Sequence, residues 1–141
     1  MWHAWIPFFV YGEISPCDGT GCRRGGEKKM EEKWITGHTG LTCLLGSPVA
    51  HSVSPAMHNE SFRYHGLDYV YLAFDVAPEQ FEKAVDGLTV MNARGFNCTM
   101  PHKRLMYERA DVLSEEARLI GAVNTVVQEN GVLTGYNTDG R

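Results

Sequence analysis

The chain reads Leu41-Thr-Cys-Leu-Leu-Gly-Ser-Pro48 where an apolar run gives way to turn-forming residues. A short apolar run that stops at glycine and proline is typical of a buried strand followed by a loop. Ser54-Pro55 comes next and predicts the first turn of a helix, with the serine as its N-cap. We expect this helix to reach about His65, where Gly66 ends it. Strand, loop and helix in this order form the unit from which layered α/β domains are built.

Strands and helices continue to alternate along the rest of the sequence. Apolar residues after Pro78 follow the spacing of one buried helix face, namely Phe81, Ala84, Val85, Leu88 and Met91. Gln128-Glu-Asn-Gly131 stands between two β-rich runs and predicts a hairpin. Strands are predicted at 41–45, 68–74, 94–99, 122–127 and 132–136, and helices at 54–65, 78–91, 103 onward and 114–120. We therefore predict an α/β layered domain with a mixed, mostly parallel sheet flanked by helices.

Composition and charge exclude several classes of partner. The 141 residues are 43% hydrophobic and 21% charged, which is ordinary for a globular protein. The net charge of −4 leaves no basic surplus for a phosphate backbone, so we expect no nucleic-acid partner. No apolar run reaches about 18 residues, so we expect no membrane partner. The cysteines and histidines lack the spacing of a zinc site, no metal is predicted, and a reduced cytoplasmic location is the default.

Residues 1–29 differ in character from the rest of the chain. Gly19-Thr-Gly21 resembles the start of a dinucleotide fingerprint, but Arg24 stands where the third glycine belongs. The apolar stretch near the start has neither the basic region nor the cleavage site of a signal peptide. Because the character changes at Met30, we interpret 1–29 as a translated leader or disordered extension and place the folded domain at 36–141.

Four loops at predicted strand ends carry polar side chains. They offer hydroxyls, carboxamides, the ammonium of Lys103 and the carboxylate of Asp139. Ligands of open α/β sheets bind beyond the carboxyl ends of strands, so these loops are the candidate site. The donors and acceptors suit a small polyhydroxylated or carboxylated molecule. The loops are 50–55, 97–103, 121–125 and 136–140.

The same loops carry a family resemblance. Gly46-Ser-Pro-Val-Ala-His-Ser-Val-Ser-Pro-Ala-Met-His58 resembles the N-terminal motif of shikimate dehydrogenases. Three further segments, Asn97–Lys103, Gly121–Thr125 and Asn137–Gly140, resemble the next motifs of that family in the same order. The resemblance covers roughly 41–140 and corresponds to the family's shikimate-binding domain. It implies the reversible, NADPH-linked reduction of 3-dehydroshikimate to shikimate.

The resemblance also implies which residues bind the substrate. Ser52 and Ser54 would hold the carboxylate of shikimate or 3-dehydroshikimate, for which hydroxyl donors are suited. Thr99, Asn124 and Asp139 would bind ring hydroxyls. Each assignment has a structural alternative: Ser54 as a helix cap, Asn124 as a partner of backbone groups within its strand, and Asp139 as an Asx-turn residue.

Lys103 and Asp139 are the catalytic pair that the resemblance implies. Hydride transfer to a carbonyl leaves a developing alkoxide, which a positioned ammonium can stabilise and protonate. A neighbouring carboxylate would orient the lysine and favour its charged form. The alternative for Lys103 is a solvated side chain at a helix start. Glu115 weakly matches a position that can approach the cofactor NADP.

Other positions and functions remain open at this point. Asn97 is either loop support or a ligand, whereas His51 and His102 are expected to be structural. The family's Rossmann domain, which binds NADP, is expected to be absent from this chain, so the truncated form is predicted to be inactive. A non-catalytic shikimate-binding or regulatory module and a quinate/shikimate dehydrogenase are the alternative functions. The resemblance allows a homodimer.

Overall fold

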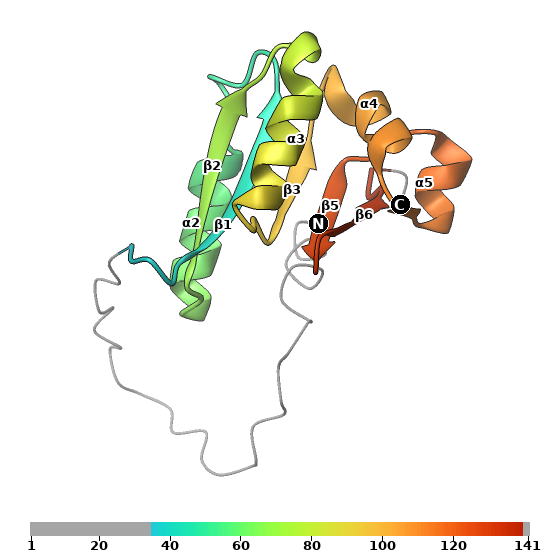
Figure 1. The fold of residues 1–141 in the computed structure, drawn as a ribbon. Coiled ribbons are helices and arrows are strands. Elements are labelled where there is room, and N and C mark those ends of the chain that lie inside the picture. Colours follow the sequence, from blue (N-terminus) through green and yellow to red (C-terminus); the bar gives the residue numbers. More distant parts are fainter. Residues whose placement is uncertain (1–34, 140–141) are drawn as a thin grey trace. The chain divides into compact units, whose positions relative to one another are not determined.

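A mixed sheet of six strands forms the centre of the part that the computed structural model describes, residues 35–139 (Figure 1). The interpretation of 1–29 as a leader lies outside the described residues. Three of the five strand pairings are parallel and two are antiparallel, which confirms the predicted mixed, mostly parallel sheet. The strand order is β2-β1-β3-β5-β6-β4. The strands are β1 (Gly40–Gly46), β2 (Tyr69–Asp75), β3 (Gly95–Cys98), β4 (Val112–Leu113), β5 (Thr125–Glu129) and β6 (Val132–Tyr136).

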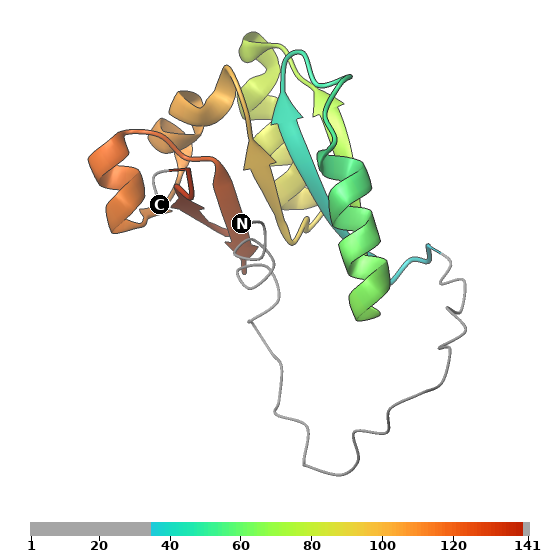
Figure 2. The ribbon, with the colours of Figure 1, turned by 180° about the vertical axis from the view of Figure 1, so that it is seen from behind.

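Helices cover both faces of the parallel part of the sheet. Figures 1 and 2 show α2 on one face of β1 and α3 on the opposite face. Gly66 adopts the left-handed conformation, with φ 67°, and ends α2 as the sequence predicts. The helices are α2 (Ser54–His65), a 3₁₀ turn η1 (Pro78–Gln80), α3 (Phe81–Val90), α4 (His102–Arg109) and α5 (Glu115–Ile120).

Strand β1 lies between two apolar clusters, one on each face of the sheet. Cys43 and Leu45 point into the larger cluster, together with α3. Leu44 points the other way and packs with Phe62 of α2 and Tyr71 of β2. Burial on both faces is why β1 reads as a continuous apolar run without alternation.

The helix predicted after Pro78 has the expected buried face over most of its length. Phe81, Val85 and Leu88 are 0–3% exposed. Met91 is expected on this face but is 63% exposed, because α3 ends at Val90 and the chain leaves the helical path at Asn92, which has φ 56°. The i, i+4, i+7 pattern therefore predicts the face correctly but extends it one turn too far.

The C-terminal part of the sheet shows one predicted and one unpredicted feature. The predicted hairpin joins β5 to β6 and turns at Asn130 and Gly131, whose φ angles of 52° and 81° suit the tight two-residue type I′ turn. The strand β4 was not predicted. It contains only two residues and pairs with β6 in parallel, a length at which alternation carries no signal.

Neither a membrane-spanning helix nor a metal cluster is present in the described part of the chain. None of the helices between residues 35 and 139 has the length and apolarity needed to cross a membrane. Within the same range, no cluster of three or more histidine, cysteine or acidic side chains is arranged to hold a metal ion.

Candidate functional site

Strand pairing brings the polar loops to one edge of the sheet. Leu45 of β1 lies opposite Cys98 of β3, so the loops that follow these parallel strands are neighbours. Asn97 of β3 lies opposite Thr125 of β5, and Thr125 lies opposite Tyr136 of β6. Because β5 runs antiparallel to both of its neighbours, its amino end meets the carboxyl ends of β3 and β6. The segments after β1, β3 and β6 and before β5 therefore share this edge.

Lys103 and Asp139 meet at this edge although 36 residues separate them in the chain. Lys103 Nζ donates to Asp139 Oδ2 at 2.6 Å. The side chains are 29% and 49% exposed, so the pair remains open to a ligand from solvent. The backbone carbonyl of Lys103 accepts the N–H of Val123 at 2.9 Å, which fixes the first turn of α4 to the segment before β5. The lysine is thus held by a partner and is not a free helix-start side chain.

Asn137 holds the loop that carries Asp139. The N–H of Asp139 donates to Asn137 Oδ1 at 3.0 Å, which makes an Asx turn, and Asn137 Nδ2 donates to the carbonyl of Ala122 at 2.9 Å. Asn137 therefore accepts in this Asx turn, while Asp139 Oδ2 accepts from Lys103 Nζ. The Asx turn that Asp139 itself could begin would end at Arg141, outside the described residues. Sequence reasoning missed Asn137, although an Asn two residues before an Asp-Gly pair is a signal for such a turn.

Asn124 is buried at 3% exposure and bonds to the same loop. Its Oδ1 accepts the N–H of Thr138 at 3.1 Å, and its Nδ2 donates to Thr138 Oγ1 at 3.0 Å. The structural alternative for Asn124 is thus partly realised, but the backbone group it satisfies belongs to the loop after β6 and not to its own strand. Asn124 therefore ties the start of β5 to the residue before Asp139.

Ser52 and Ser54 lie between β1 and the first turn of α2. Ser52 Oγ accepts the N–H of Ser54 at 3.2 Å. The expected N-cap role of Ser54 is wrong: Val53 occupies that position and makes no side-chain cap bond, and Ser54 is already helical. Since its hydroxyl caps no N–H of α2, it can serve a ligand. Both serines are half-buried.

Thr99 lies at this edge, whereas Glu115 makes no described bond to the Lys103–Asp139 pair. Thr99 directly follows β3, its N–H donates to the carbonyl of Leu45 at 2.9 Å, and its side chain is half-buried. Glu115 is the exposed first residue of α5. No hydrogen bond or ion pair within residues 35–139 joins it to Lys103 or Asp139. The structure therefore does not bring Glu115 into the cluster, and its role toward a cofactor stays a prediction.

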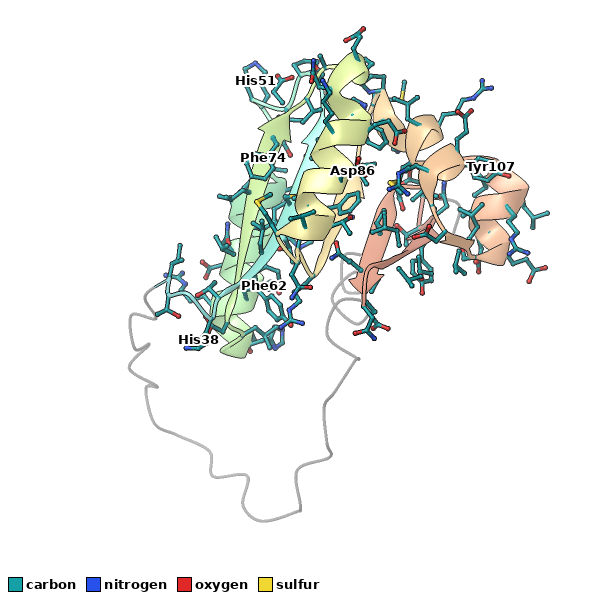
Figure 3. All side chains as sticks on the ribbon, viewed as in Figure 1. His38, His51, Phe62, Phe74, Asp86 and Tyr107 are labelled. Carbon is teal, nitrogen blue, oxygen red and sulfur yellow. The ribbon has the colours of Figure 1, made fainter. Side chains whose placement is uncertain are left out.

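The buried histidine and thiols offer no nucleophile here. His102 is fully buried, its Nε2 lies 2.7 Å from the carbonyl of Val76, and its ring stacks on Phe81. That carbonyl can only accept, so Nε2 carries the proton. His51 is exposed at the end of the sheet toward which β2 points (Figure 3). Burial raises the pKa of the Cys43 thiol to about 12, which keeps it protonated.

Comparison with known families gives this edge a context. Residues 44–126 match the family described as the shikimate dehydrogenase substrate binding domain, which is more than half of the chain. The chain belongs to this family. The match runs from within β1 to the start of β5 and includes the segments with Ser52, Thr99 and Lys103, while Asp139 lies beyond it.

Longer proteins are similar to a larger share of this chain. A shikimate dehydrogenase (NADP(+)) of Alkaliphilus metalliredigens is 55% identical over 112 residues, which are 79% of this chain and 39% of that protein. The crystal structure of shikimate 5-dehydrogenase from Listeria monocytogenes in complex with shikimate and NAD is 53% identical, with a TM-score of 0.74 over 77% of this chain and 37% of its own. The ligand-free 5-ketofructose reductase of a Gluconobacter strain is 39% identical, with a TM-score of 0.73 over 74% of this chain and 38% of its own.

Gly46 provides a test of how tightly this edge is packed in the shikimate dehydrogenase domain. A Cβ at Gly46 would overlap the side chains of Thr99 and Val49. We expect Gly46→Ala to lower the free energy of unfolding by about 1–3 kcal/mol, because both neighbours must shift. Denaturant unfolding of the purified protein measures this. Gly87→Ala is the control: Gly87 lies within α3, and a Cβ there meets no atom outside its own helix within 4 Å, so the free energy of unfolding should not fall. An equal loss in both variants would contradict the prediction.

Proposed function

We propose that this chain provides the substrate-binding part of an NADP-dependent shikimate dehydrogenase, which reversibly reduces 3-dehydroshikimate to shikimate. The observation that carries the proposal is the contact of Lys103 with Asp139 at the edge where the loops after β1, β3 and β6 converge. It is supported by the match of the chain to the family's substrate binding domain. The chain spans 39% of the length of its Alkaliphilus relative, so the activity of a whole enzyme is part of the proposal.

In this proposal Lys103 and Asp139 act on the oxygen of the carbon that changes oxidation state. Reduction of a ketone places negative charge on that oxygen, and the Lys103 ammonium stabilises it and supplies a proton. Asp139 orients the ammonium, because its Oδ2 already accepts one of the three Nζ protons at 2.6 Å. The two remaining protons of Nζ are available to substrate oxygens.

The remaining residues are proposed to bind the substrate at fixed distances from that pair. Ser52 and Ser54 offer hydroxyl donors to a carboxylate, and the Ser54 hydroxyl is not used as a cap. Thr99 directly follows β3 and Asn124 directly precedes β5. Both are proposed to bind ring hydroxyls beside Lys103. Together with Lys103 and Asp139, these groups come from four segments that the sheet holds together, so they can fix the orientation of a rigid ring.

The residues of this chain do not by themselves fit the cofactor. The 141 residues contain no G-x-G-x-x-G loop, and Glu115 is the one side chain proposed to approach NADP. We assign most of NADP binding to protein outside this chain, in keeping with the longer relatives. NADPH would supply the hydride for the reduction, and NADP⁺ would accept it in the reverse direction. Cytoplasmic location and a homodimer are further proposals, which fractionation and light scattering would check.

The proposal predicts that the 141-residue protein binds shikimate but does not reduce NADP. We expect weak binding, in about the millimolar range, since only one side of the substrate is contacted. Titration of the ¹⁵N-labelled protein with shikimate measures the affinity, and the nicotinamide absorbance band measures the reaction. Cyclohexanecarboxylate, which lacks the ring hydroxyls, is the control ligand. Equal affinity for both ligands would overturn the substrate assignment.

A chimera tests the proposed catalytic competence. Residues 35–139 replace the matching segment of the Listeria monocytogenes relative, which is 54% identical. The chimera is expected to oxidise shikimate with NADP. Binding without turnover in a folded chimera would favour a non-catalytic binding or regulatory module.

A second candidate is the reduction of another polyhydroxylated ketone. The likeness to 5-ketofructose reductase, at 39% identity, favours it, because the same domain occurs there in a protein named for a different substrate. The ketone that corresponds to quinate, 3-dehydroquinate, belongs to the same chemical class. Kinetics of the chimera with NADPH and 3-dehydroshikimate, 3-dehydroquinate or 5-ketofructose distinguish these substrates by their kcat/KM ratios.

A further inference from the structure

A chain of buried hydrogen bonds runs from β2 through β3 to β5. The Tyr71 hydroxyl donates to Asn97 Oδ1 at 2.8 Å, and Asn97 Nδ2 donates to Thr125 Oγ1 at 3.1 Å. Thr125 Oγ1 in turn donates to Asn124 Oδ1 at 3.1 Å. All four residues are 1–7% exposed. We call the three residues Tyr71, Asn97 and Thr125 the amide relay, because they end on the carboxamide of Asn124.

Two backbone groups, the carbonyl of Asn124 and the N–H of Thr138, fix the direction of every hydrogen bond in the relay. Asn97 Nδ2 also donates to the backbone carbonyl of Asn124 at 3.2 Å, and a carbonyl can only accept. Asn97 Oδ1 must therefore face Tyr71, whose hydroxyl must donate. At the far end the backbone N–H of Thr138 can only donate, so Asn124 Oδ1 must face it at 3.1 Å. Burial raises the pKa of Tyr71, which keeps its donor proton in place.

This direction determines what Asn124 can offer to a ligand. One proton of its Nδ2 goes to Thr138 Oγ1, and no described contact uses the other. Flipping the carboxamide would turn Nδ2 toward the N–H of Thr138, which is also a donor. The N–H of Thr138 and the relay hydroxyl of Thr125 both donate to Asn124 Oδ1. Together they favour the orientation in which Asn124 Nδ2 donates to a ligand oxygen and the side chain secures the residue before Asp139.

We propose that Tyr71, Asn97 and Thr125 are positioning residues that fix the Asn124 carboxamide and, through Thr138, the loop of Asp139. The inference rests on the proposed function, since it gives Asn124 a substrate hydroxyl to bind. None of the three needs to touch the substrate. Their contribution is to hold the donor and the carboxylate in place before the ligand arrives.

The test compares two buried threonines in the 141-residue protein. Thr125→Val removes the relay hydroxyl but keeps the shape of the side chain. Thr42→Val is the matched control, because Thr42 is 1% exposed and its Oγ1 donates to the carbonyl of Val70 at 2.9 Å, outside the relay. Thr125→Ser restores the hydroxyl and serves as the rescue variant. Thermal unfolding reports the stability of each variant.

Two readouts separate positioning from stability. Thr125→Val is expected to weaken shikimate binding about tenfold and to speed hydrogen exchange of the Thr138 amide about tenfold. Thr125→Ser should recover both, and Thr42→Val should change neither beyond its effect on stability. The same result for Thr125→Val and Thr42→Val would overturn the inference. If the unmodified protein binds no shikimate, the proposed function fails, and exchange of the Thr138 amide still decides the role of the relay.

Discussion

Lys103→Met is expected to lower the turnover number of the chimeric enzyme by about 10³-fold. The loss combines the removal of a proton donor, worth about 10²–10⁴-fold, with the loss of charge stabilisation at the same oxygen. The KM for shikimate should change much less, because the contacts proposed for Ser52, Ser54, Thr99 and Asn124 do not involve Lys103. Steady-state kinetics over a range of shikimate concentrations measures both constants.

The matched control for this variant is Lys83→Met, on the exposed face of α3. It makes the same chemical change away from the Lys103–Asp139 contact, so turnover should stay as it was. Asp139→Asn should fall between the two, since the ammonium remains but loses its orienting partner. If Lys103→Met raised KM and left the turnover number intact, Lys103 would be a binding residue and the proposed role would be wrong.

The fold was predictable where burial produces a recognisable pattern of apolar residues, either a continuous run or a helical spacing. Strand β1 shows a continuous apolar run because clusters cover both of its faces, and α3 shows the i, i+4, i+7 spacing of a helix with one buried face. Local signals also sufficed for Gly66 and for the turn at Asn130-Gly131, because both need φ values that few residues adopt. β4 escaped prediction, since two residues are too few for any period.

The loops that meet at the candidate site were predictable from the sequence, but the contacts between their residues were not. Motif resemblance named Lys103 and Asp139, and strand pairing then placed them 2.6 Å apart. The motifs could not show that Asn137 accepts the hydrogen bond of the Asx turn or that the Ser54 hydroxyl caps no N–H of α2. Both features depend on one or two backbone angles, which the motifs do not specify. The amide relay left no signal either: Tyr71, Asn97 and Thr125 lie on three strands, and no local pattern joins residues so far apart in the chain.

Phe96→Ala is expected to have the largest effect on stability, with a loss of about 3–5 kcal/mol in the free energy of unfolding. Phe96 is fully buried in β3, paired with Cys43 on one side and Val126 on the other, and it belongs to the larger apolar cluster. Removing the ring leaves a cavity that strands held on both sides cannot close. The loss is a large share of the roughly 5–15 kcal/mol typical of a domain. Urea unfolding followed by circular dichroism measures it.

Phe74→Ala is the matched control, because this phenylalanine lies on the edge strand β2 and is 37% exposed. The same atoms are removed, but water already reaches the side chain and no closed cavity forms, so the loss should be about 1 kcal/mol. Equal losses would show that β3 is not the centre of the packing. The result also bears on the site, since Asn97 follows Phe96 directly and points to the opposite face of β3. A cavity under β3 should therefore loosen the relay as well as the core, and Phe96→Ala should speed exchange at the Thr138 amide where Phe74→Ala does not.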